Sequence, residues 1–147
     1  MRIVSMGIWQ LWAGAAALFA ALTAVLAKLG VQGIDANLAT LLRTLVVAAA
    51  LTVLLAATGQ LPWNQLQNLP AASLTALVLS GLATGASWLC YFQALQLGPV
   101  SRVAPIDKLS VVLVAVLGVW VLGEQLSGRG WVGVLLMGLG AVLVAWP

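Results

Sequence analysis

Five hydrophobic stretches occupy almost the whole of this 147-residue chain, and they constrain its fold more than any other feature. A helix needs about 20 mostly apolar residues to cross a hydrocarbon core of roughly 30 Å, and each stretch is close to that length. The predicted spans are Trp9–Leu29, Ile34–Ala57, Ala72–Leu95, Val100–Leu122 and Gly130–Trp146. The sequence therefore predicts an all-α membrane protein, with five transmembrane helices in a single domain over residues 1–147.

The composition excludes a soluble protein. The chain is 63% hydrophobic and 6% charged, whereas soluble domains contain roughly 25% charged residues. Its net charge of +3 comes from scattered single residues, so there is no basic run to bind nucleic acid. We expect a multi-pass protein of a bacterial-type cytoplasmic (inner) membrane that contacts membrane lipid and has no nucleic-acid partner.

Residues that commonly carry catalysis or hold metals are scarce. The chain has no His, and its single Cys90 lies inside a hydrophobic span without the spacing of metal ligands. We interpret Cys90 as a small packing residue. Since no nucleophile–base pairing or phosphate-binding loop is found either, the sequence predicts no enzyme, no metal site and no cofactor.

The positive charges that flank the spans are divided evenly between the two sides of the membrane. An odd number of spans puts the termini on opposite sides. Arg2 and Arg129 then lie on the N-terminal side, and Lys28 and Arg102 on the other. An excess of Lys and Arg in short cytoplasmic loops normally sets orientation. Because the count is two against two, we expect the chain to insert both ways and to pair with an inverted copy of itself.

Aromatic and small residues also follow membrane patterns. Six of the seven Trp residues lie near span ends, as in interfacial aromatic belts: Trp9, Trp12, Trp63, Trp120, Trp131 and Trp146. Small residues let membrane helices approach closely. They form a G-x-x-x-G pair at Gly81 and Gly85, and in the fifth span Gly133 and Gly140 share a face with Ala141. That face is one hypothesis for the surface that meets the inverted copy.

An ordered set of motifs runs through the second half of the chain. Tyr91-Phe92-Gln93-Ala94-Leu95 precedes Gly98-Pro99-Val100-Ser101-Arg102-Val103-Ala104-Pro105, and Leu122-Gly123-Glu124-Gln125-Leu126 leads to a Gly-rich last span. In order and spacing the chain resembles the EamA-type repeat of the drug/metabolite transporter superfamily. Most similar members carry two repeats of opposite topology, ten helices in all, whereas this chain has one. The resemblance therefore implies that two antiparallel copies form the carrier.

Three ionisable residues, Arg43, Asp107 and Lys108, lie inside the predicted spans, where charges are rare and costly. Both of their helices start from the C-terminal side of the membrane. Arg43 lies nine residues past Ile34, and Asp107 seven past Val100. At 1.5 Å per residue both are roughly 10–14 Å into the membrane, so an Arg43–Asp107 contact within one subunit is geometrically allowed. The resemblance is closer to single-repeat members here, since two-repeat members are usually uncharged at this point.

Asp107 and Lys108 are adjacent, so on a helix their side chains point about 100° apart and do not face each other. One can pair with Arg43, and we expect Lys108 to face a central water-accessible cavity. Two cations against one acid leave a surplus positive charge, which favours an anionic or zwitterionic substrate. The alternative is a purely structural ion network that fixes helix register. The other candidate cavity-lining residues are Trp88, Tyr91, Gln93 and Ser110.

Together these patterns predict a secondary transporter, an exporter of small organic metabolites or drugs, that works as a homodimer by alternating access. Two alternatives stay open. The first is a small multidrug-resistance-type exporter of cations. Such exporters depend on an acid in the first helix, and Trp9–Leu29 has none. The second is a non-transporting scaffold or lipid-handling subunit, which would place the charges against protein rather than water.

The even charge count makes orientation testable. A reporter fused to the C-terminus should give signal on both sides of the membrane, because neither side has the excess of Lys and Arg that retains it in the cytoplasm. One orientation for all copies would contradict the prediction.

Overall fold

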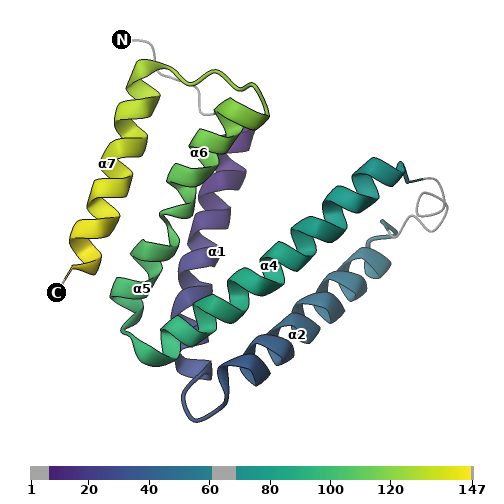
Figure 1. Ribbon diagram of the computed structural model, residues 1–147. Coiled ribbons are helices and arrows are strands. Elements are labelled where there is room, and N and C mark those ends of the chain that lie inside the picture. The colour runs from purple at the N-terminus through teal and green to yellow at the C-terminus, as the bar shows by residue number, and fades with distance from the viewer. Residues whose placement is uncertain (1–6, 61–68, 147) are drawn as a thin grey trace. The chain divides into compact units, whose positions relative to one another are not determined.

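The computed structural model describes residues 7–60 and 69–146, and every regular element among them is a helix (Figure 1). The elements are α1, Ile8–Gly30; α2, Ala36–Ala57; α4, Ala71–Leu97; α5, Val100–Asp107; α6, Ser110–Val121; and α7, Gly128–Ala145. Taking α5 and α6 as one segment, five segments are long and apolar enough to cross a membrane. The predicted all-α fold with five spans is thus confirmed, with each span end within two residues of its predicted position. Arg2 and Trp63 lie outside the described residues.

The prediction of one continuous fourth helix over Val100–Leu122 is wrong. The first part, α5, ends at Asp107, and Lys108 and Leu109 form a turn before α6 begins at Ser110. The fourth span is therefore a discontinuous helix, with its break inside the membrane-spanning segment.

Pro105 lies inside α5, three residues before the break. Proline has no backbone N–H, and its ring crowds the carbonyl four residues earlier, here that of Ser101. The next turn closes differently. The N–H of Leu109 donates to the carbonyl of Ile106, three residues back, at 3.0 Å. A mid-helix change to this tighter pattern often marks a hinge.

The chain folds as two compact units, residues 1–29 with 97–147 and residues 30–96. In the first unit, α7 runs antiparallel to α5 and α6 and packs on both (Figure 1). Gly138 of α7 lies close to Val112 of α6, since a Cβ at Gly138 would lie 3.2 Å from Cγ2 of Val112. Lys28 Nζ donates to the carbonyl of Gly98 at 2.9 Å, which joins the end of α1 to the turn before α5.

The second unit is a hairpin of α2 and α4, which run antiparallel (Figure 1). Gln96 Nε2 donates to the carbonyl of Ile34 at 2.6 Å, joining the end of α4 to the turn before α2. Ala36 and Leu95, near the same end, are fully buried. At the far end α2 ends at Ala57, and Gly59 follows two residues later with a positive φ of 65°, the left-handed conformation that ends many helices.

The described surface is largely apolar. Trp9, Trp12, Trp120 and Trp146 each expose more than 70% of their area, and each lies within a turn or so of a span end. Most of the large aliphatic side chains along the helices are exposed as well. Such a surface would aggregate in water, so it fits a chain whose solvent is hydrocarbon.

The α6–α7 contact can be tested at Gly138. We expect Gly138→Leu to lower the stability of the purified protein by about 1–3 kcal/mol, the usual range for overpacking, in thermal or denaturant unfolding in detergent. Gly14→Leu, inside the span formed by α1, is the control, because a Cβ there would meet nothing within 4 Å. Equal losses of stability in the two variants would contradict the assignment.

Candidate functional site

A close ion pair lies at the break in the fourth span. Lys108 Nζ and Asp107 Oδ2 are 3.1 Å apart. The expectation that these neighbouring side chains do not face each other is therefore wrong. That expectation assumed a continuous helix. In the structure α5 ends at Asp107, and the next residue, Lys108, has a ψ of −8° rather than the helical value near −42°. The turn brings the two charges together.

The pair lies well inside the membrane-spanning segment. Asp107 is seven residues beyond the start of α5 at Val100, which corresponds to about 10 Å at 1.5 Å per residue. An ionised group at this depth is costly, and such groups usually pair with one another. The ion pair meets that requirement locally, and Lys108 still exposes 59% of its side chain.

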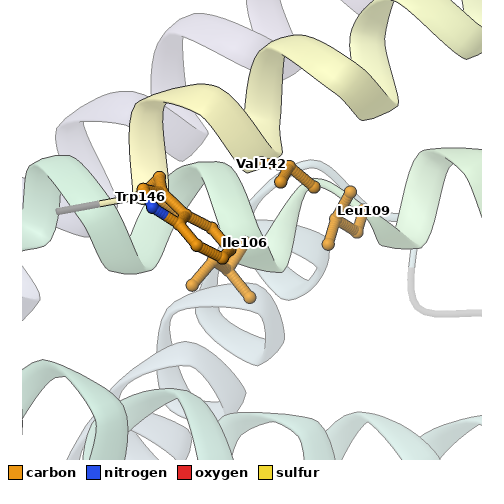
Figure 2. A pocket seen from close by; sticks show the side chains of 5 residues that line it. Ile106, Leu109, Val142 and Trp146 are labelled. Atoms are coloured by element: carbon orange, nitrogen blue, oxygen red, sulfur yellow. The ribbon is translucent and has the colours of Figure 1, made fainter.

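An apolar hollow of about 300 Å³ flanks the break. Ile106 and Leu109 come from the break itself, while Val142, Ala145 and Trp146 come from the end of α7 (Figure 2). The hollow thus lies beside the break, between it and the C-terminal end of α7.

Arg43 forms a second cluster, in the other unit. Its guanidinium carbon is 4.2 Å from the centroid of the Trp88 ring and 5.6 Å from that of Phe92. Both rings lie on α4, four residues apart and hence on one face of the helix. The cluster is a cation–π stack that brings together two of the predicted site residues, Arg43 and Trp88.

The stack offsets only part of the free-energy cost of placing the charge of Arg43 inside the membrane. A cation–π contact contributes about 0.5–2 kcal/mol, whereas an Arg at the centre of a membrane helix costs about 2.5–3.5 kcal/mol even on insertion scales. The stack alone therefore leaves part of the insertion free energy of Arg43 uncompensated. Sequence reasoning missed Phe92, although its spacing from Trp88 was a usable signal.

The remaining predicted site residues are more dispersed. Gln93 is exposed on α4, and Ser110 is exposed at the first position of α6. The partner described for Asp107 is Lys108, and the ring contacts of Arg43 are with Trp88 and Phe92. Because Arg43 and Asp107 belong to different units, their mutual contact stays a prediction.

A family comparison covers nearly the whole chain. The EamA-like transporter family model matches residues 7–146. The chain belongs to the EamA-like transporter family. A Sinorhizobium protein described as an uncharacterized transporter in the cobO 3′ region is 53% identical over 137 residues, which are 93% of this chain and 96% of that protein. No solved structure matches the chain significantly. The EamA resemblance is thus confirmed, and the protein is a multi-pass membrane transporter.

The accessibility of Lys108 can be measured directly. In a background with Cys90→Ala, Lys108→Cys should react with a membrane-impermeant thiol reagent, because an exposed group at this depth is favourable only beside water. A Cys at Val114, an exposed apolar position on α6, is the matched control and should react more slowly. If Lys108→Cys stays unlabelled in a folded protein, Lys108 does not face water.

Proposed function

We propose that this EamA-family protein is a secondary transporter that exports small organic molecules across the cytoplasmic membrane by alternating access. The observation that carries the proposal is the charged pair Asp107–Lys108 at the break of a discontinuous membrane helix. In many secondary transporters, substrate and coupling-ion sites are formed by broken helices near the bilayer midplane.

Asp107 is the proton-linked group in this proposal. It is the one acid that the sequence places deep within a span, since Asp35 and Glu124 lie at or beyond helix ends. When Asp107 is ionised it holds Lys108, and when it is protonated the ion pair is lost. Because the pair sits at a turn between two helices, this change of charge would act where the fourth span is already interrupted.

The transporter is proposed to be an antiparallel homodimer. One chain supplies five spans, and carriers built from inverted repeats place their binding site at the interface between the repeats. The even division of flanking Lys and Arg supports insertion in both orientations. Two copies would then supply the two inverted repeats that the substrate site requires.

The charge distribution bears on the kind of substrate. With Asp107 and Lys108 paired, the remaining charge deep within the spans is that of Arg43, since Lys28, Arg102 and Arg129 lie near helix ends. A surplus cation favours an anionic or zwitterionic substrate over a simple cation. The lack of an acid within α1 argues in the same direction, against an exporter of the small multidrug-resistance type.

The test is flux into liposomes that contain the purified protein, driven by an imposed pH gradient, for a panel of amino acids, organic anions and cationic drugs. We expect flux of at least one anionic or zwitterionic solute, and we expect Asp107→Asn to abolish its pH-driven component while the dimer stays intact. Some loss of stability should accompany it, because Lys108 loses its partner.

Glu124→Gln is the matched control, since Glu124 lies in the loop between α6 and α7 and should leave the flux unchanged. Unchanged flux in Asp107→Asn would remove Asp107 from the mechanism. Absence of any flux in the parent protein would contradict the proposed function itself.

A further inference from the structure

Arg43 lies in a unit that has no carboxylate to neutralise it. Between Gly30 and Gln96 the sequence contains one acid, Asp35. Its Oδ1 accepts from the N–H groups of Asn37 and Leu38 at 2.9 and 3.1 Å, which caps the start of α2. Asp35 is also eight residues from Arg43, about 12 Å along a helix. The positive charge of Arg43 therefore remains uncompensated within this unit.

The aromatic stack leaves the hydrogen-bonding edge of Arg43 unused. A guanidinium is planar, and its five N–H donors point outward in that plane. The rings of Trp88 and Phe92 contact the guanidinium, and neither side chain has an oxygen that could accept from its N–H groups. Among the residues described in this unit, no hydrogen bond or ion pair of Arg43 is present.

The surroundings hold Arg43 in place without competing for its charge. Phe92 is 3% exposed and provides a firm apolar surface. The hydroxyls of Thr40 and Thr44 each donate to a carbonyl of their own helix at 2.8 Å. Arg43 is thus an oriented cation on a rigid aromatic surface, seven residues or about 10 Å beyond the start of α2 at Ala36.

We propose that Arg43, stacked on Trp88 and Phe92, binds the carboxylate of a monoanionic substrate. The inference rests on the proposed transport function and names its substrate class. Two parallel N–H groups of a guanidinium match the two oxygens of a carboxylate. One guanidinium neutralises one monoanion, whereas a phosphate dianion would bring an unbalanced negative charge into the hydrocarbon.

The experiment measures binding to the purified dimer in detergent. The probes are acetate, benzoate and octanoate, together with the amide of each and inorganic phosphate, and the readouts are the unfolding midpoint and Trp fluorescence. At least one carboxylate should raise the midpoint of the parent protein, and its amide should not. We expect Arg43→Gln to weaken that binding about tenfold or more, since a hydrogen-bonded charge partner is lost. Arg43→Lys should fall between the two, because it keeps the charge without the planar fork.

A second pair of variants covers the case in which Arg43→Gln does not fold. Trp88→Leu removes the ring that orients Arg43 and should weaken carboxylate binding, while Trp12→Leu, an exposed Trp on α1, should leave it unchanged. Carboxylate binding that is equally tight in Arg43→Gln or Trp88→Leu and in the parent overturns the proposal. So does binding of phosphate alone, or of none of the probes.

The flux assay separates this site from the transport function. If the protein moves solutes but no carboxylate among them, the carboxylate site is wrong and transport stands. If nothing is transported while a carboxylate still binds through Arg43, the site stands and the transport proposal fails.

Discussion

The cost of charge in hydrocarbon governs the arrangement of the polar residues in this protein. Three charged side chains lie deep within the spans, and each of them has a contact with another side chain. Asp107 and Lys108 form an ion pair, and Arg43 lies over the rings of Trp88 and Phe92. The two solutions differ in one respect. The ion pair is neutral as a unit, whereas the aromatic stack leaves a full positive charge in place, and that charge is where an anion gains most.

Backbone chemistry and side-chain charge act together in the fourth span. Pro105 cannot donate to the carbonyl one turn back, and the helix stops two residues later, at Asp107. On a continuous helix, adjacent side chains diverge. The turn at Lys108 removes that restriction and lets its ammonium reach the neighbouring carboxylate. The ion pair and the interruption of the helix thus lie at the same place in the fourth span.

The presence of one EamA repeat in this chain bears on how many copies of the chain form the transporter. Family membership is established over residues 7–146, yet the apolar surface of the described residues offers large areas without a partner inside the chain. Lipid covers such surfaces, and so would an inverted copy. In the proposed dimer each subunit would supply one Arg43 cluster and one Asp107–Lys108 pair. The substrate class would then follow from charges that every subunit supplies in equal number.

Hydrophobic length alone was enough to predict five spans and their ends to within two residues, because the bilayer fixes how long an apolar helix must be. The charged residues deep within the spans, Arg43, Asp107 and Lys108, were equally evident, since ionisable residues stand out in so apolar a sequence. Their partners were not. The Asp107–Lys108 contact depends on the turn at residues 108–109, and a helical repeat does not describe how a turn redirects side chains. Pro105 indicates an irregular helix, but it does not give the geometry of the turn. Likewise the Arg43 stack joins α2 to α4 across more than forty residues of chain. Periodicity is a local property and determined the helices, whereas the pairing of charges and rings depends on contacts between segments, which only the folded chain defines.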